Sequence, residues 1–228
     1  IYRQVLREGF HPGSTLRHGL TAGEALARPI LDGWRQQTGL ELYEALGMSE
    51  ISTYISSSPS VPVRPGSPGK PQPGRSVTIL GNGQLGVHRT DPGLFLRYWG
   101  EEPIDGEWFA TGDTAEIDAD GYVWYHGRGD DLMNAGGFRV SPLEVESVLL
   151  QHPTVAEAGV REWKVSDTAS IIAAFVVPQA GGSPNEAALQ GFVGERLAPH
   201  KCPKQFWFVP ALPRTANGKL IRKALEKP

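Results

Sequence analysis

Residues 127–139 read Gly-Arg-Gly-Asp-Asp-Leu-Met-Asn-Ala-Gly-Gly-Phe-Arg, and they separate two parts of the chain that differ in character. Before them, short apolar segments are divided by turn dipeptides such as Asp120-Gly121, a pattern typical of a β-rich unit. After them, the patterns of strands and helices alternate. We therefore predict an α+β protein of two domains, residues 1–128 and residues 129–228.

The second part carries clear start and stop signals for its elements. Ser141 can cap a helix, Pro142 suits its first turn, and Glu144 completes a capping box, so a helix should run to about Gln151. The other expected elements are strands at 138–140, 155–161, 170–177 and 205–209, a helix at 185–197, a polar loop at 214–218 and a short terminal helix.

The first part is expected to begin with a helix over 19–37, because apolar residues recur there at helical spacing, followed by a strand at 40–43. Residues 56–74 are rich in Pro, Ser and Gly and predict a loop or a subdomain boundary. Short strands are expected at 77–80, 84–87, 108–110, 115–117 and 122–126.

Composition excludes several classes of function. With 39% hydrophobic and 21% charged residues and a formal charge of −3, the chain should form a substantial core, and it lacks the excess charge of a nucleic-acid or acidic-membrane surface. No apolar run is long enough for a membrane span. The single cysteine, Cys202, fits a reducing compartment, for which the cytoplasm is the simplest expectation. The chain begins at Ile1, which predicts missing upstream sequence or N-terminal processing.

The first candidate for chemistry is Gly47-Met48-Ser49-Glu50, which follows an apolar segment. It offers backbone, a hydroxyl and a carboxylate in sequence, which suits phosphate and Mg²⁺ because this ion favours a few carboxylates together with substrate phosphates. A capped turn without a ligand is the alternative.

A second candidate is Thr111-Gly112-Asp113, which follows Trp108-Phe109-Ala110. Gly112 should allow a tight turn that leaves Asp113 at a strand end, where its carboxylate could accept both hydroxyls of a ribose. The alternative is an ordinary Gly-Asp turn between two strands.

The dividing stretch itself is the third candidate. Arg128 suits a ribose or phosphate, and the pair Gly136-Gly137 indicates a narrow ligand passing close to the backbone. A flexible linker with solvated charges is equally compatible with this composition.

The fourth candidate is Pro213-Arg214-Thr215-Ala216-Asn217-Gly218-Lys219. It is a glycine-containing loop that could deliver Lys219 into a distant site. Taken alone, a solubilising surface lysine is the other interpretation.

Taken in order, the four motifs resemble those of the adenylate-forming enzymes, the superfamily of acyl-CoA synthetases, peptide-synthetase adenylation domains and luciferases. The resemblance covers essentially the whole chain and implies the C-terminal portion of an acyl- or aryl-CoA ligase. The first domain would then be a remnant of the large nucleotide-binding domain with a small β-rich subdomain, and the second would be a compact α+β lid. The upstream portion of the same enzyme would be the missing partner.

The resemblance also implies roles for individual residues. Lys219 and Glu50 would be catalytic, with Glu50 holding Mg²⁺; Asp130 would be the hinge, and Gly136 and Gly137 would border the pantetheine of coenzyme A. The nucleotide, ATP or AMP, would be bound by Gly23, Glu24, Ala25, Glu44, Ala45, Leu46, Gly47, Met48, Ser49, Asp113, Arg128 and Arg139.

In this family a carboxylic acid attacks the α-phosphorus of ATP to give acyl-AMP, and the thiol of coenzyme A then attacks the acyl carbon, with rotation of the C-terminal domain between the two steps. The family's phosphate-gripping loop, rich in Ser, Thr and Gly, is not found in this sequence, and Leu46 stands where an aromatic residue is frequent. Two alternatives stay open: a non-catalytic module that binds nucleotide or coenzyme A, and an adenylation domain that loads a carrier protein. The acid substrate is not readable.

Overall fold

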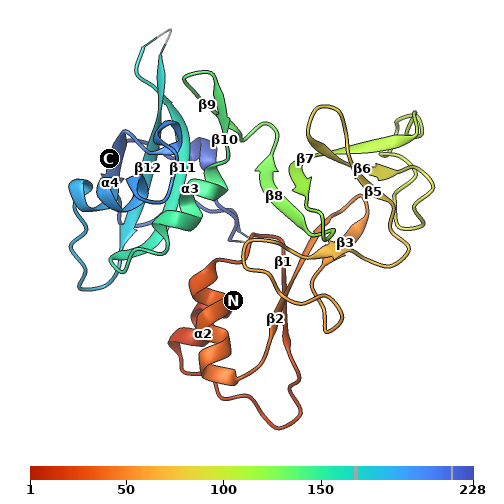
Figure 1. The fold of residues 1–228 in the computed structure, drawn as a ribbon, viewed down its shortest axis with the longest axis horizontal. Coiled ribbons are helices and arrows are strands. Elements are labelled where there is room, and N and C mark those ends of the chain that lie inside the picture. The colour runs from red at the N-terminus through yellow and green to blue at the C-terminus, as the bar shows by residue number, and fades with distance from the viewer. Residues whose placement is uncertain (167–168, 217) are drawn as a thin grey trace. The chain divides into compact units, whose positions relative to one another are not determined.

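The computed structural model describes residues 1–166, 169–216 and 218–228 (Figure 1). It divides into two compact units, Ile1–Gly129 and Asp130–Pro228. Within the described residues, no helix has both the length and the apolar character that a membrane crossing requires.

The first unit begins with two helices and a four-stranded sheet of order β1-β2-β3-β4. The helices are α1 (Tyr2–Arg7) and α2 (Arg28–Thr38), and the strands are β1 (Gly19–Ala22), β2 (Leu42–Met48), β3 (Ser52–Ser56) and β4 (Lys70–Pro71). Strands β1 and β2 are parallel, and α2 connects them. Helix α2 packs through Leu31 and Trp34 against Leu42, and all three side chains are buried.

The predicted helix over 19–37 is wrong in its first part, where Gly19–Ala22 forms β1 instead. This strand is paired with β2 from Gly19 opposite Leu42 to Ala22 opposite Ala45. A partner 23 positions away leaves no trace in local periodicity, so the helical spacing of later residues was extended too far toward the N-terminus.

An antiparallel sheet of order β5-β6-β7-β8 completes the first unit. Its strands are β5 (Val77–Ile79), β6 (Gln84–His88), β7 (Trp108–Ile117) and β8 (Val123–Arg128). One cluster of buried side chains joins the two sheets: Ile51, Tyr54, Ile55, Leu85, Val87, Ala115 and Val123.

Strand β7 replaces the two short strands expected at 108–110 and 115–117. Gly112 interrupts it with a φ of 79°, and the pairing with β6 shifts its register between Gln84 and Gly86. The backbone therefore bulges at Gly112 rather than turning back. The sequence predicted that Asp113 lies at a strand end. This prediction is wrong, because Asp113 lies inside β7.

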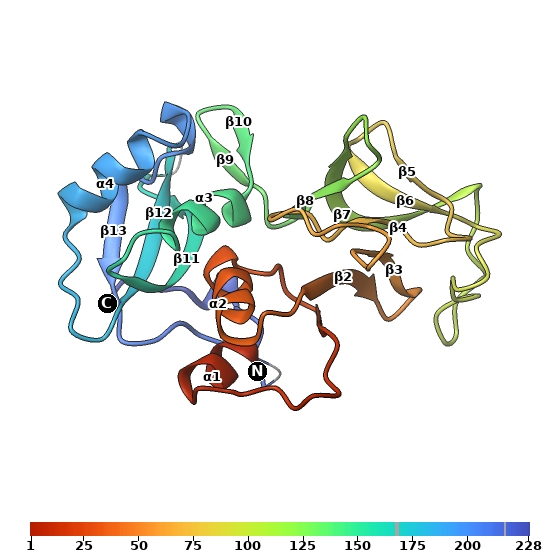
Figure 2. The ribbon, with the colours of Figure 1, turned by 60° about the horizontal axis from the view of Figure 1, so that its bottom comes forward.

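The second unit combines a small hairpin with a three-stranded sheet and two helices (Figure 2). Its strands are β9 (Met133–Ala135), β10 (Phe138–Val140), β11 (Val155–Lys164), β12 (Ser170–Pro178) and β13 (Gln205–Phe208). The helices are α3 (Pro142–Leu149) and α4 (Glu186–Gly194), with short 3₁₀ turns at Pro199–Lys201 and Arg222–Ala224.

Helix α3 begins with the predicted Ser141 cap, and α4 begins with a cap at Asn185 that was not predicted. The Ser141 hydroxyl accepts from the Glu144 N–H at 3.4 Å, and the Asn185 side chain accepts from the Ala188 N–H at 2.7 Å. Each cap satisfies a backbone donor that the first helical turn leaves unpaired. The expected strands at 155–161, 170–177 and 205–209 are all present, although β11 runs further, to Lys164.

Both faces of the sheet β11-β12-β13 are covered. Ile172, Ala174 and Val176 of β12 point into a core shared with α3 and α4. The alternate residues Ala173 and Phe175 point to the opposite face, where Leu212, Leu220 and Leu225 of the C-terminal segment pack. The last residues of the chain are thereby fixed on the sheet, and they carry the loop that ends at Lys219.

Candidate functional site

The turn at Gly23-Glu24-Ala25, expected on the adenine side of a nucleotide, is exposed. The side chain of Glu44 accepts a hydrogen bond from the residue that follows this turn. Leu26 N–H donates to Glu44 Oε1 at 2.9 Å, and the Glu44 side chain is buried in β2. Glu44 is also fixed through its backbone, because its N–H donates to Ser57 Oγ at 2.8 Å. At least one Glu44 oxygen therefore supports the turn.

Burial raises the pKa of Glu44 from 4.5 to about 7, and the hydrogen bond from Leu26 opposes this shift only in part. A raised pKa in the folded state favours folding below pH 4.5, and that contribution is lost as the pH rises through 7. We expect Glu44→Gln to stabilise the first unit above pH 7, by on the order of 3 kcal/mol at most, and to change little near pH 4. Urea unfolding between pH 4 and 8 measures this.

Glu41→Gln is the matched control, because Glu41 is more exposed and pairs with Arg35 at 2.6 Å on the surface. Its unfolding free energy should follow that of the parent chain at every pH. A pH dependence of Glu44→Gln that matches the parent would show that Glu44 stays ionised in the folded chain.

The motif Gly47-Met48-Ser49-Glu50 spans the end of β2 and the turn into β3. Ser49 is exposed, and Glu50 is partly buried. Tyr98 donates from its hydroxyl to Glu50 Oε1 at 2.8 Å, and the Glu50 carbonyl accepts from the Phe95 N–H at 2.7 Å. Ala45 and Leu46 precede the motif in β2, where Ala45 is buried. Within the described residues, the second carboxylate oxygen of Glu50 makes no hydrogen bond to the protein.

Asp113 is the centre of a polar cluster in the first unit. Its side chain is 7% exposed, and it lies opposite Arg128 in the pairing of β7 with β8. Arg128 Nη1 is 3.8 Å from Asp113 Oδ1, and the Tyr125 hydroxyl donates to the same oxygen at 3.3 Å. Thr111 shapes the backbone, because its hydroxyl accepts from the Asp113 N–H at 3.1 Å.

Tyr125 is a member of this cluster that the sequence analysis missed. Burial raises the pKa of Tyr125, and the negative charge of Asp113 raises it further; the same two causes act on the buried Tyr54. Both phenols are therefore protonated at neutral pH, so Tyr125 acts as a donor to the Asp113 carboxylate.

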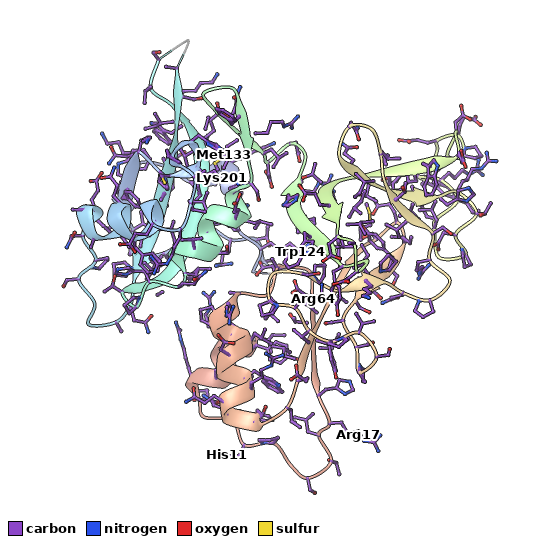
Figure 3. All side chains as sticks on the ribbon, viewed as in Figure 1. His11, Arg17, Arg64, Trp124, Met133 and Lys201 are labelled. Atoms are coloured by element: carbon purple, nitrogen blue, oxygen red, sulfur yellow. The ribbon has the colours of Figure 1, made fainter. Side chains whose placement is uncertain are left out.

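The hairpin that presents the cluster is fixed at its far end by Asp118. Arg64 and Trp124 lie side by side (Figure 3), and both reach Asp118 Oδ2, at 3.2 Å and 3.0 Å. The hydrogen bond from Trp124 is the largest cause that lowers the pKa of Asp118. Asp118, directly after β7, is thus linked to Trp124 of β8, which fixes the end of the hairpin next to its turn.

In the second unit, Gly136 and Gly137 form the two-residue turn between β9 and β10. Their φ values of 59° and 89° match a hairpin turn that requires positive φ at both positions. Turn geometry therefore accounts for this glycine pair without a ligand, and contact with pantetheine stays a prediction. Arg139 and Asp130 are exposed, and Asp130 is the first residue of its unit.

Lys219 is exposed at the end of a closed loop. Thr215 ties this loop together: its N–H donates to the Lys219 carbonyl at 2.8 Å, and its hydroxyl accepts from the Lys219 N–H at 3.1 Å. Asn217, which belongs to the predicted motif, lies outside the described residues. The first unit thus brings Asp113 and Arg128 together, whereas Arg139 and Lys219 belong to the second unit.

Comparison with known proteins relates the chain to one family. Residues 144–219 match the AMP-binding enzyme C-terminal domain. Human acyl-coenzyme A synthetase ACSM4, a mitochondrial protein, is 34% identical over 250 residues, which covers 99% of this chain and 43% of that protein. The chain therefore spans less than half the length of this relative.

Two solved structures give the same result. The anthranilate CoA ligase AuaEII in complex with anthranoyl-AMP matches with a TM-score of 0.84 and 34% identity, over 92% of this chain and 44% of that one. The o-succinylbenzoate coenzyme A synthetase MenE of Bacillus subtilis, in complex with ATP and magnesium, matches with a TM-score of 0.84 and 30% identity, over 98% of this chain and 49% of that one. The chain belongs to the adenylate-forming acyl-CoA synthetase superfamily, and it corresponds to the C-terminal portion of such proteins.

Proposed function

We propose that the chain is part of an AMP-forming acid–thiol ligase, which activates a carboxylic acid with ATP and transfers the acyl group to coenzyme A. The observation that carries this proposal is the cluster around Asp113. A buried carboxylate held by a phenol and a guanidinium is a fixed acceptor, which suits the two donor hydroxyls of a ribose. The complexes of AuaEII with an acyl-AMP and of MenE with ATP support it.

In the first half-reaction, the carboxylate oxygen of the acid attacks the α-phosphorus of ATP, and pyrophosphate leaves. Asp113 orients the ribose, Arg128 and Tyr125 keep Asp113 in place, and the turn at Gly23-Glu24-Ala25 lies beside the adenine. The Lys219 ammonium offsets negative charge on the attacking carboxylate and on the α-phosphate. Such positioned charge is the main form of catalysis in phosphoryl transfer.

Glu50 would hold Mg²⁺. One of its oxygens accepts from Tyr98, which fixes the side chain and leaves the other oxygen to a ligand. No group of three or more His, Cys, Asp or Glu side chains suited to a metal occurs in the described part of the chain. This fits Mg²⁺, which binds through one or two carboxylates together with substrate phosphates. The ion would supply positive charge to the phosphates.

In the second half-reaction, the thiol of coenzyme A attacks the acyl carbon, and AMP leaves. The proposal assigns the exposed hairpin turn at Gly136-Gly137 to the pantetheine side. Rotation of the second unit about Asp130 would withdraw Lys219 and present this hairpin, which is consistent with a unit boundary directly before Asp130. The proposal also includes a carboxylic acid as the substrate and the cytoplasm as the location of the protein.

We expect Asp113→Asn to weaken the binding of AMP to this chain about tenfold, because a charged acceptor is replaced by a neutral amide of the same size. Isothermal titration calorimetry with AMP measures the change. Glu116→Gln is the control: Glu116 is on the same strand, its side chain is 79% exposed, and the substitution should leave AMP affinity unchanged. Equal affinity in Asp113→Asn and the parent chain would exclude Asp113 from the nucleotide site.

A further inference from the structure

The contribution of Lys219 to the reaction rate depends on how firmly its backbone is held in position. Its ammonium is at the end of a long, exposed side chain, and a misplacement of about 1 Å at a reacting centre can cost on the order of a hundredfold in rate. The bonds between Thr215 and Lys219 close the loop on itself. They do not attach the loop to the sheet.

Arg214 adds a polar attachment to the sheet, beside the apolar packing of Leu212 and Leu220. Its Nη2 atom donates to Glu157 Oε2 at 2.5 Å, and its Nη1 atom donates to the Gly218 carbonyl at 2.6 Å. Glu157 is on β11 and pairs with Val177 of β12, next to a register shift between Val155 and Glu157, so it belongs to the paired part of the sheet. The Gly218 carbonyl belongs to the peptide group that Lys219 itself completes. One guanidinium therefore joins the sheet to the backbone directly before the lysine.

Partial burial strengthens the ion pair between Arg214 and Glu157. The side chains of Arg214 and Glu157 are 33% and 23% exposed, so solvent screens their charges less than those of an exposed pair. A planar guanidinium has several donors in a fixed fork, and it can serve two acceptors at once. The ammonium of a lysine is a point charge and would not hold both acceptors in the same geometry.

We propose that Arg214, anchored on Glu157, is a positioning residue for Lys219; this inference rests on the proposed adenylation function. Arg214 acts through the Gly218 carbonyl and does not touch the reactants. Its loss leaves Lys219 in the chain but allows the loop to move. The binding of ATP, which the proposed function assigns to the first unit, is not changed.

The test is a double-mutant cycle of Arg214→Met and Lys219→Ala in the ligase polypeptide that contains this chain, with carboxylate-dependent pyrophosphate exchange as the readout. Arg214→Met should lower kcat about tenfold and leave the KM for ATP within about twofold. In the Lys219→Ala background, Arg214→Met should slow the reaction by less than about threefold, because the group that it positions is gone. Arg196→Met is the control: Arg196 pairs with Glu195 at 3.0 Å on the surface of the same unit.

A charge exchange separates positioning from simple stabilisation. Glu157→Arg together with Arg214→Glu restores an ion pair, but the introduced carboxylate cannot donate to the Gly218 carbonyl. Compared with Arg214→Met, the exchanged variant should regain the thermal stability of the parent protein, but its kcat should stay low. Recovery of kcat, or effects of Arg214→Met and Lys219→Ala that multiply, would overturn the proposal.

Amide hydrogen exchange on this chain distinguishes the two possible failures. Arg214→Met should raise the exchange rate of the Lys219 amide about tenfold, and unchanged exchange would overturn the positioning role irrespective of activity. If this amide exchanges faster while Lys219→Ala leaves pyrophosphate exchange unchanged, Arg214 does hold the loop and the proposed adenylation role of Lys219 is the part that fails.

Discussion

Lys219→Ala is expected to slow carboxylate-dependent pyrophosphate exchange at least about a hundredfold, with a small change in the KM for ATP. The attacking carboxylate and the α-phosphate are both negative, and their repulsion grows as they approach. A cation that meets them in the transition state lowers the barrier more than it strengthens binding of the ground state. Rate and affinity should therefore respond differently to its removal.

Lys223→Ala is the matched control for this prediction. Lys223 is also exposed and follows Lys219 by four residues, but it lies beyond the closed loop, in the 3₁₀ turn Arg222–Ala224. Its replacement should leave the exchange rate unchanged. Equal rates for Lys219→Ala and Lys223→Ala would remove Lys219 from the adenylation step. A loss confined to transfer to coenzyme A would assign it to the other half-reaction.

Arg222→Met is expected to destabilise the second unit by about 3–5 kcal/mol, the usual cost of removing one partner from a buried ion pair. The side chains of Arg222 and Glu146 are 14% and 9% exposed. Arg222 Nη2 donates to both Glu146 oxygens, at 2.9 Å and 2.7 Å, and the Val160 N–H donates to Oε1 at 2.7 Å. Without Arg222, the Glu146 carboxylate stays buried with a single backbone donor.

The loss should depend on pH. Burial raises the pKa of Glu146 from 4.5 to about 7, although Arg222 favours the ionised form. Removing Arg222 raises this pKa further, so the ionised carboxylate becomes costlier and the difference between variant and parent should grow from pH 5.5 to pH 8. Urea unfolding at the two pH values measures it. A loss below about 1 kcal/mol at pH 8 would contradict a tight buried pair.

The double variant Glu146→Leu with Arg222→Met shows whether the pair stabilises the unit or only avoids an unpaired charge. Buried ion pairs can often be replaced by apolar side chains at little cost. We therefore expect the double variant to be more stable than Arg222→Met alone. Glu146 lies in α3 and Arg222 three residues after Lys219, so this pair also fixes the C-terminal segment to the helix.

Local signals in the sequence were sufficient for most of the second unit. Ser141 and Pro142 act within one helical turn, so their roles at the helix start follow from neighbouring residues alone. The central strand β12 is rich in β-branched residues and is buried on both faces, which gives the same prediction from propensity and from burial.

The first unit was predicted less well because its elements depend on distant partners. Strand β1 forms because it pairs with β2, which follows α2 in the sequence. The four residues of β1 carry no strand pattern of their own. Strand β7 appeared as two strands because Gly112 was interpreted as a turn. A single glycine inside a strand pattern is also the signal of a bulge, and the pairing of Thr114 with Gly127 keeps the strand continuous.

The candidate site shows the same division. Asp113 and Arg128 were found from motifs, and an antiparallel hairpin that turns near Asp120-Gly121 brings these positions opposite each other. The same hairpin carries Tyr125, but a tyrosine in a strand is usually a core residue, and its role became visible only through the hydrogen bond to Asp113. Glu44, predicted only to line the adenine pocket, supports the neighbouring turn through Leu26.

The most direct test of the central claim is the identity of the nucleotide product. The ligase polypeptide that contains this chain should be incubated with ATP, Mg²⁺, coenzyme A and a panel of aliphatic and aromatic carboxylic acids, and the nucleotides should be separated by chromatography. We expect AMP and pyrophosphate in amounts that depend on one or more of the acids. Formation of ADP and phosphate, or AMP that is independent of any carboxylic acid, would contradict it.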